Sequence, residues 1–193
     1  MILIIDGPSC AGKSTLISLL LTNPLFKKII TFTTRKPRSN ETDGIDYNFI
    51  SHDQFCEMIA SNKFIEYASN HGNMYGKTFE SIKDITSSSL IPILDIDFKG
   101  LRTYIELFGR SHIISCFITA PIPELKKRMI LRDGYIDDVR IRNGEIEVSN
   151  FNNNCEMFDI YADTAAETLT KIAERIIRTA TKRLEEEHTN KIE

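Results

Sequence analysis

Apolar residues along the chain are concentrated in three short runs, each ending in polar or glycine-containing sequence. These runs are MILII at 1–5, LIPIL at 90–94 and IISCFIT at 113–119. Uninterrupted apolar runs of this length are typical of strands that are buried on both faces of a parallel sheet. The pattern therefore predicts buried strands over 1–6, 87–97 and 112–120.

Other stretches place apolar residues at helical spacing. Such a pattern predicts helices from Ser14 to Leu21, around 123–132, and from Thr164 onward, where Glu167 is the expected capping partner. Ser51 and Gln54 fit a capping box, so a further helix is expected to begin there. Its apolar side is predicted to consist of Phe55, Met58, Ile59 and Ile65.

The remaining segments carry turn residues. Residues 29–50 are predicted to be extended and turn-rich, 64–78 to form strand and loop, and the asparagine cluster at 150–154 to form a loop. Strands that alternate with helices predict an α/β fold with a parallel sheet covered on both faces. Ligands of such sheets gather at the carboxyl ends of the strands, where Gly7–Ser14, Asp95 and Asp97 are expected to share one edge.

Composition narrows the class of protein. The 193 residues include 41% hydrophobic and 26% charged residues with a net charge of −3, which favours one domain, 1–193, and gives no sign of nucleic-acid binding. The four cysteines, at 10, 56, 116 and 155, do not have metal-site or disulfide spacing and are expected to be free thiols. Without a signal peptide or a membrane-length apolar run, a cytoplasmic protein is expected.

Candidate chemistry begins directly after the first predicted strand. The sequence GPSCAGKST at 7–15 matches G-x-x-x-x-G-K-[ST], and it lies between a predicted strand and a predicted helix as this motif requires. The glycines allow backbone N–H groups to surround a phosphate, Lys13 can reach the β- and γ-phosphates, and the Ser14 hydroxyl can bind Mg²⁺. The motif predicts nucleoside triphosphate binding by Gly7, Pro8, Ser9, Cys10, Ala11, Gly12, Lys13, Ser14 and Thr15.

A second candidate anion site lies in 31–51. Arg35 and Arg38 flank Pro37, which favours extended backbone, and Tyr47 supplies a hydroxyl. Two guanidinium groups can hold a phosphate through forked hydrogen bonds. The alternative is a pair of solvated arginines on a loop.

Four stretches beyond the phosphate loop resemble guanylate kinases. The segment TTRKPRSNETDGIDYNF at 33–49 is similar to the acceptor segment T-T-R-x-P-R-x-x-E-x-x-G-x-D-Y-x-F of that family. FIEYASNHGNMYGK at 64–77, ILDIDFKG at 93–100 and LKKRMILR at 125–132 resemble its second acceptor segment, its L-D-I-D-x-x-G strand end and the start of its lid. The similarity runs in order from residue 2 to about 145.

The resemblance implies roles for individual residues. The acceptor phosphate would be held by Arg35, Arg38, Tyr47 and Tyr75, while Asp97 would lie on the base side and Asp95 near the metal, directly or through water. The two aspartates could instead cap the following helix. Thr31 and Gly76 would belong to the guanine site. The implied base reader is Glu66, because one carboxylate can accept both the N1–H and the 2-amino group of guanine, whereas adenine presents a lone pair at N1. Without the family resemblance, Glu66 would be interpreted as a carboxylate on the protein surface.

Two positions depart from the family pattern. Lys77 stands where a serine usually binds the guanine O6; an ammonium can donate to O6 as well, but it could also pair with Glu66 or Asp97. Ala162 replaces an asparagine near the donor base, and Asp163 remains. The preference for the acceptor base and for the donor base is therefore left open.

The implied lid contributes arginines to the transferring phosphoryl group. Arg128 and Arg132 are four residues apart and would share one helix face. The third lid arginine is assigned to Arg142, with Arg140 as the alternative. Lys13, Arg128, Arg132 and Arg142 are the predicted catalytic residues, and no general base is assigned, because the acceptor phosphate is already an oxyanion.

The sequence as a whole predicts a P-loop nucleoside monophosphate kinase fold. It would have a core at 1–32, 91–125 and 148–186, an acceptor-binding insert near 33–90 and a helical lid near 126–147. The implied reaction converts ATP and GMP, or dGMP, to ADP and GDP with Mg²⁺, in a monomer or homodimer that binds neither membranes nor nucleic acid. The alternatives are a kinase for another small phosphorylated acceptor, such as a ribose bisphosphate, and a non-catalytic module that binds phosphopeptides.

Overall fold

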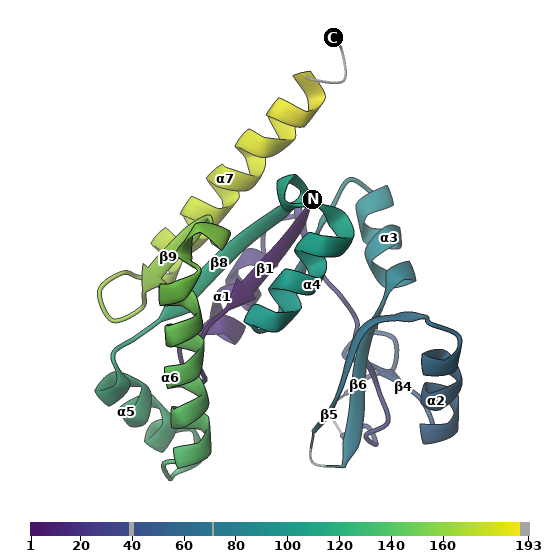
Figure 1. The fold of residues 1–193 in the computed structure, drawn as a ribbon, viewed down its shortest axis with the longest axis horizontal. Coiled ribbons are helices and arrows are strands. Elements are labelled where there is room, and N and C mark those ends of the chain that lie inside the picture. Colours follow the sequence, from purple (N-terminus) through teal and green to yellow (C-terminus); the bar gives the residue numbers. More distant parts are fainter. Residues whose placement is uncertain (39–40, 71, 190–193) are drawn as a thin grey trace. The chain divides into compact units, whose positions relative to one another are not determined.

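The computed structural model describes residues 1–38, 41–70 and 72–189 and divides into two compact units (Figure 1). One unit consists of Met1–Phe26 and Ile93–Glu193, and the other of Lys27–Pro92. Positions 39, 40 and 71, which fall within the two acceptor-like segments, lie outside the described residues.

The first unit is built on a five-stranded sheet with the strand order β2-β7-β1-β8-β9. Its strands are β1 (Ile2–Asp6), β2 (Phe26–Lys28), β7 (Ile91–Asp95), β8 (Ile113–Thr119) and β9 (Ile160–Asp163). β1 pairs in parallel with β7 and β8, and β8 with β9; every residue of β1 and β8 is buried. The predicted parallel sheet with apolar central strands is therefore confirmed.

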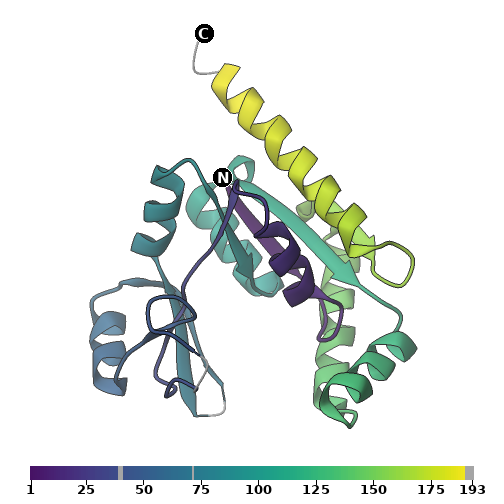
Figure 2. The same ribbon diagram turned by 180° about the vertical axis from the view of Figure 1, so that it is seen from behind.

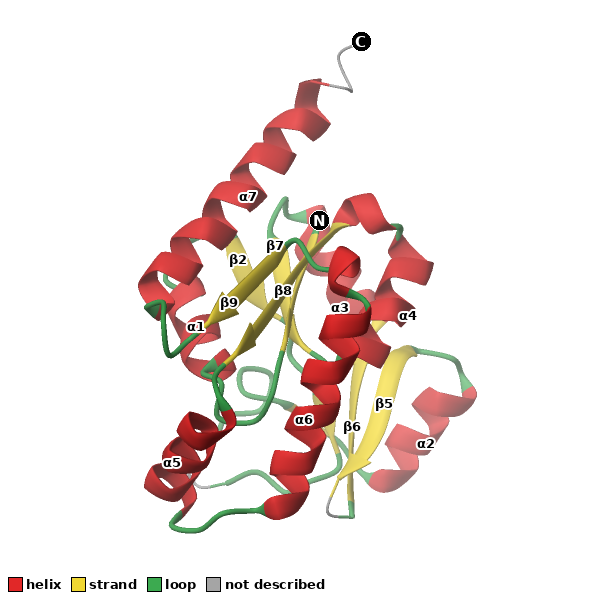
Figure 3. Ribbon diagram, turned by 60° about the vertical axis from the view of Figure 1, so that its left-hand side comes forward, coloured by secondary structure: helices red, strands yellow, loops and turns green. Residues whose placement is uncertain are grey.

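Helices cover both faces of this sheet. α1 (Lys13–Leu20) and α7 (Leu169–Thr189) contact each other on one face, and α4 (Phe98–Phe108) and α6 (Asp138–Asn153) contact each other on the opposite face (Figures 1 and 2). α5 (Ile122–Asp133) and α6 form a helical hairpin beyond the carboxyl end of β8 (Figure 3). The P-loop NTPase-type α/β class is thereby confirmed.

The second unit contains a four-stranded sheet in the order β4-β3-β6-β5. Its strands are β3 (Phe32–Thr33), β4 (Asn48–Phe49), β5 (Phe64–Asn70) and β6 (Asn73–Thr78), and its helices are α2 (His52–Ala60) and α3 (Phe79–Ser87). The predicted capping box of Ser51 and Gln54 is present in full. Phe55 of α2 stacks on Phe64 of β5 with 4.4 Å between the ring centroids, which fastens the helix to the sheet.

Several local predictions are wrong because tertiary contacts override local patterns. α3 occupies the first residue of the strand expected over 87–97, Ile65 lies in β5 and not on α2, and α6 continues through Asn153 where a loop was expected. α7 begins at Leu169 rather than Thr164, and the Thr168 hydroxyl accepts a hydrogen bond from the backbone of Lys171 at its start. α4 corresponds to the helix that Asp95 and Asp97 were considered to cap, although its bounds were not predicted.

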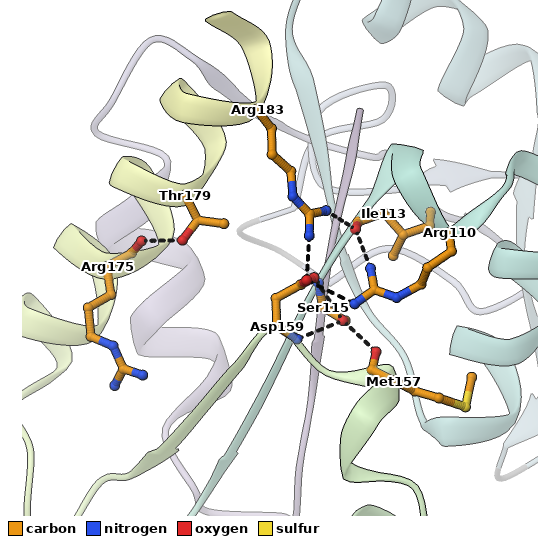
Figure 4. A network of polar contacts seen from close by, with 8 residues as sticks. All are labelled: Arg110, Ile113, Ser115, Met157, Asp159, Arg175, Thr179 and Arg183. Atoms are coloured by element: carbon orange, nitrogen blue, oxygen red, sulfur yellow. Dashed lines mark hydrogen bonds and ion pairs between the residues drawn. The ribbon is translucent and has the colours of Figure 1, made fainter. Parts of the chain in front are cut away.

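A polar network ties α7 to the amino end of β8 (Figure 4). Arg110 and Arg183 both donate to Oδ1 of Asp159 and to the carbonyl of Ile113. The other oxygen of Asp159 accepts from the Ser115 backbone N–H at 2.8 Å. This network lies at the amino ends of the strands, whereas the phosphate loop lies at their carboxyl ends. We therefore assign it a structural role.

All four cysteines are free thiols, as expected, and burial raises the pKa of Cys116 to about 12. Within the described part of the chain, none of the helices combines the length and the apolar character needed to span a bilayer.

Candidate active site

The phosphate loop joins β1 to α1 and depends on backbone conformations that favour glycine. Gly7 has φ 141° and Gly12 has φ 104°. A Cβ on Gly7 would lie 1.9 Å from the carbonyl oxygen of Ile118, so no side chain fits there. Cys10 adopts φ 68° in the same loop. The loop is therefore held in a strained, curved conformation at the amino end of α1, where N–H groups and the helix dipole favour an anion.

The ammonium of Lys13 lies inside this curve. It donates to the carbonyl oxygens of Gly7 and Pro8, the latter 3.3 Å away, and is 3.9 Å from a carboxylate oxygen of Asp95. Phosphate oxygens can replace these carbonyls as acceptors without a change of loop backbone, because the lysine side chain has freely rotating bonds.

A cavity of about 560 Å³ opens over the loop. Its lining brings together most of the residues predicted for donor binding and transfer: Pro8, Ser9, Cys10, Gly12, Lys13, Ser14, Thr15, Asp95, Arg128 and Arg132, with Leu169 added by α7. The lining includes three cationic side chains and one carboxylate. Such an excess of positive charge suits a polyanionic ligand. Gly7 and Ala11, which also belong to the loop, are buried and do not line this cavity.

Arg128 is fixed to the loop by the segment that follows β9. Its guanidinium donates to the Thr164 hydroxyl at 2.8 Å, to the Thr164 carbonyl at 3.1 Å and to the Cys10 carbonyl at 3.4 Å. Glu124, one turn earlier on α5, accepts from its Nε at 2.9 Å. Arg128 is thus held at the cavity wall.

The other lid arginines are arranged differently. Arg132 lines the cavity and is paired with Asp133, which raises the pKa of the Arg132 guanidinium. Arg140 is paired with Asp133 and Asp137. Arg142 is exposed and does not line the cavity, and its side chain makes no hydrogen bond or ion pair with the residues that the structure describes.

The two acidic residues at the end of β7 differ in their surroundings. Asp95 lines the cavity together with Ser14, so a carboxylate and a hydroxyl, both ligands that Mg²⁺ prefers, face the same space. The donor set therefore fits the metal that the motif implies. Asp97 caps α4 by accepting from the Gly100 N–H at 2.9 Å, which is the alternative role considered for this pair.

Two acidic residues lie near the loop, Asp6, which is buried, and Glu147, which is half-buried. Asp6 is 2% exposed; its Oδ1 accepts from the Gly7 N–H at 2.6 Å. Among the described residues, neither Asp6 Oδ2 nor Glu147 Oε2 has a hydrogen-bond partner. Burial raises the pKa of Asp6 to about 7, and it raises that of Glu147 on α6 to about 7 as well.

In the second unit, the candidate phosphate residues form a cluster. Arg35 donates to both oxygens of Glu41, at 2.8 and 3.0 Å, and lies 5.3 Å from the centroid of the Tyr47 ring. Tyr47 is in edge contact with Tyr75 at 6.2 Å between centroids. The Arg35 guanidinium lowers the pKa of Glu41. Arg38 extends into solvent, although its backbone N–H donates to Glu41.

The candidate base residues lie on the hairpin of β5 and β6. Glu66 is paired across the ladder with Lys77, whose Nζ is 2.6 Å from Oε1. Gly76 points to the other face, where a Cβ would lie 2.6 Å from the ring of Phe64, so packing requires its glycine. Thr31 precedes β3, and its carbonyl accepts from Asn48.

Four residues in these surroundings were not identified from the sequence: Glu41, Glu147, Thr164 and Leu169. Glu41 could have been identified from the sequence, because it is the glutamate of the acceptor-like motif. The other three are far in sequence from the loop, and only the fold brings them to it.

Comparisons with known proteins agree with this arrangement. A family model described as guanylate kinase matches residues 1–180. Guanylate kinases of Bdellovibrio bacteriovorus and Histophilus somni are 36% and 39% identical; the alignments cover 76% and 77% of this chain and 80% and 74% of those proteins. Guanylate kinase 1 of Arabidopsis thaliana is 38% identical over 76% of this chain, which spans only 39% of that longer protein.

A solved structure shows the same fold. The guanylate kinase of Anaplasma phagocytophilum has a TM-score of 0.68 and 28% sequence identity, and the comparison covers 94% of this chain and 84% of that one. Family model, relatives and structure coincide with the phosphate loop, the acceptor-like segment and the arginine-bearing hairpin. The chain belongs to the guanylate kinase family, which consists of P-loop kinases for nucleoside monophosphates.

Proposed function

We propose that this protein transfers the γ-phosphoryl group of ATP to GMP, and to dGMP, and releases ADP and GDP. The observation that carries this proposal is the cavity over the phosphate loop, which unites Lys13, Asp95, Arg128 and Arg132. Membership of the guanylate kinase family supports the same reaction. Neither alternative, another phosphorylated acceptor or a phosphopeptide module, is favoured.

On the donor side, we assign the triphosphate to the loop residues 7–15. Lys13 would exchange its two carbonyl partners for β- and γ-phosphate oxygens. When bound, Mg²⁺ neutralises phosphate charge, and Ser14 and Asp95 would hold it, directly or through water. Arg128, already anchored at the cavity wall, would donate to the transferring group together with Arg132, since positioning and charge neutralisation dominate phosphoryl transfer.

Arg142 would complete this set only if the lid moves, because it is exposed at present. Arg140 is the weaker candidate, since two aspartates already hold it. The lid near 126–147 would then include most of α5 and most of α6, on a core at 1–32, 91–125 and 148–186. Closure of such a lid excludes water and protects ATP from hydrolysis.

On the acceptor side, we assign phosphate binding to Arg35, Arg38, Tyr47 and Tyr75 in the insert near 33–90. The pairing of Arg35 with Glu41 holds the guanidinium beside the two tyrosines before a ligand arrives. Base recognition is assigned to Glu66, with Thr31, Gly76 and Lys77 of the same unit. The assignment of Asp97, a residue of the other unit, to the base side rests on the family pattern alone. We further propose a cytoplasmic monomer or homodimer with nucleotides as its partners.

The test is ADP release from Mg²⁺-ATP with GMP, dGMP, AMP, CMP, UMP, dTMP or ribose 1,5-bisphosphate, with a blank that lacks an acceptor. Rapid turnover with GMP and dGMP is expected. Preference for another acceptor would overturn the assignment, as would a folded protein that binds ATP but turns over none of the panel. Lys171→Ala, an exposed change on α7, serves as a matched control for purification and stability.

A further inference from the structure

Glu66 and Lys77 form an ion pair between the two strands of the hairpin. The pair joins β5 near its start to β6 near its end, and the side chains of Glu66 and Lys77 are 25% and 17% exposed, respectively. The distance of 2.6 Å between Lys77 Nζ and Glu66 Oε1 is that of a charge-assisted hydrogen bond. A half-buried pair of this kind is screened less by solvent than an exposed one.

A β-bulge creates the pairing. Phe64 is opposite Thr78, but the next pair is Glu66 with Lys77, so β5 contains one extra residue, Ile65, at this point. Without the bulge, continued pairing would place Ile65 opposite Lys77, and Glu66 opposite Gly76, which lacks a side chain. The irregularity therefore puts the carboxylate and the ammonium on one face of the ladder, at cross-strand distance.

The pair presents a donor beside an acceptor. One proton of the Lys77 ammonium is used by Glu66, and two remain for an oxo group. Oε2 of Glu66 remains for an N–H donor. A 6-oxopurine offers this edge, an oxo group next to N1–H, whereas a 6-aminopurine offers an amino group to the ammonium and a lone pair to the carboxylate.

The pair also changes the cost of losing the guanine 2-amino group. In a site where the carboxylate has no other partner, a base that lacks the 2-amino group leaves one charged oxygen without a hydrogen-bond donor. This weakens binding by roughly tenfold to a hundredfold. Here Oε1 keeps its bond to Lys77 whether or not the 2-amino group is present. The site therefore needs one donor from the base and not two.

We propose that Lys77 is a specificity-determining residue that makes the acceptor site read the 6-oxo and N1–H edge and tolerate loss of the 2-amino group, so that 6-oxopurine nucleotides without this group are also acceptors. This inference rests on the proposed function, because it assigns the base site to the hairpin. Rejection of 6-aminopurine nucleotides is retained.

The test compares kcat/KM for GMP, inosine 5′-monophosphate and AMP in the full chain and in Lys77→Ser and Lys77→Met. In the wild type, the inosine nucleotide is expected within about tenfold of GMP, with AMP far below both. In both variants, the ratio of inosine nucleotide to GMP should fall by roughly tenfold, while KM for ATP is unchanged. Lys63→Ser, an exposed lysine just before β5, should leave the ratio unaltered.

The outcomes separate the two proposals. Two results would overturn the role of Lys77 while leaving the proposed function in place. One is a wild type that turns over GMP but has a low ratio of kcat/KM for inosine 5′-monophosphate to kcat/KM for GMP. The other is a ratio that is equal in the wild type and the variants. Absence of GMP turnover in the folded wild type would overturn the proposed function and this inference with it. If the variants fold poorly, calorimetric titration of wild type with both nucleotides decides, since affinities more than about a hundredfold apart contradict the proposal.

Discussion

The guanidinium of Arg128 and the hydroxyl of Thr164 are joined by a hydrogen bond of 2.8 Å. The single proton of the same hydroxyl lies within hydrogen-bond distance of two carbonyl oxygens, that of Ala11 at 2.9 Å and that of Thr119 at 3.0 Å. A single side chain after β9 thus connects an arginine of α5 with the inside of the phosphate loop. Thr164 is a positioning residue in this arrangement, because it contacts the loop and the arginine.

Replacement of Thr164 by valine removes the hydroxyl and keeps the volume. We expect kcat to fall by about tenfold or more, because Arg128 loses the shortest of the hydrogen bonds that position it, and the free energy of unfolding to fall by about 1–2 kcal/mol. Steady-state kinetics and urea unfolding measure both. Thr170→Val, an exposed change on α7, is the control; equal behaviour of the two variants would contradict a positioning role.

Removal of the loop cation should stop the reaction without unfolding the protein. In Lys13→Ala, turnover should fall by at least about a thousandfold, since charge neutralisation at the β- and γ-phosphates is lost. The circular dichroism spectrum and the melting temperature should stay near those of the wild type. Wild-type turnover in a folded variant would exclude Lys13 from the mechanism.

Gly144 on α6 lies against the phosphate loop. A Cβ at this position would be 2.9 Å from Cβ of Pro8, and the proline ring cannot rotate away. We expect Gly144→Ala to lower the free energy of unfolding by about 1–3 kcal/mol and to weaken ATP binding, despite the better helix propensity of alanine. Asn143→Ala, one residue earlier and exposed, should change neither. Stabilisation of Gly144→Ala would show that α6 does not press on the loop.

The burial of Asp6 predicts a pH dependence of stability. The pKa of Asp6 rises from 3.8 to about 7 on folding, mainly through burial, with Glu147, Lys13 and Asp97 as its charged neighbours. Between these values the folded state retains a proton that the unfolded state has lost, so stability decreases as pH rises through this range and levels off above it. Each unit of pKa difference corresponds to about 1.4 kcal/mol.

Asp6→Asn removes this titration and keeps an acceptor for the Gly7 N–H. Relative to wild type, the variant should become more stable as pH increases from about 4 to about 7, by an amount on the order of a few kcal/mol. Urea unfolding at several pH values measures the difference. A difference that stays constant across this range, as expected for the exposed control Asp84→Asn, would show that Asp6 is ionised throughout.

The network around Asp159 should be structural only. Asp159→Asn weakens its bonds to Arg110 and Arg183, and we expect the free energy of unfolding to fall by about 1–3 kcal/mol. The KM values should be retained at a temperature at which the variant is folded, because the network lies at the amino ends of the strands and the phosphate loop at their carboxyl ends. Arg102→Gln, which breaks an exposed pair with Glu106 at 3.9 Å, should cost less than about 0.5 kcal/mol.

Elements whose signals are local were predictable. The capping box at Ser51 and Gln54 needs only residues three apart, and both side chains make the expected bonds. The apolar runs predicted three buried strands, and the loop motif with its neighbouring strand and helix predicted the anion site. These features follow from backbone geometry and burial, which a short window of sequence contains.

Other features could not be predicted from neighbouring residues, because they depend on contacts with residues that are far away in the sequence. Thr164 and Glu167 have the spacing of a capping box, yet Thr164 bonds to Ala11 and Thr119, and the helix starts five residues later at Leu169. Glu147 becomes a site neighbour only because α6 crosses the loop, as the closeness of Gly144 to Pro8 shows. No window of sequence contains such contacts.

The sequence by itself therefore determined the family, the parallel α/β class, the phosphate loop and the set of candidate residues, because these depend on residue identity and spacing. It left open whether Lys77 would pair with Glu66 or with Asp97. The tertiary structure decided for Glu66, since one extra residue in β5 sets the register that brings the two side chains together. Register between strands is a property of the assembled sheet, so no short window of sequence contains it.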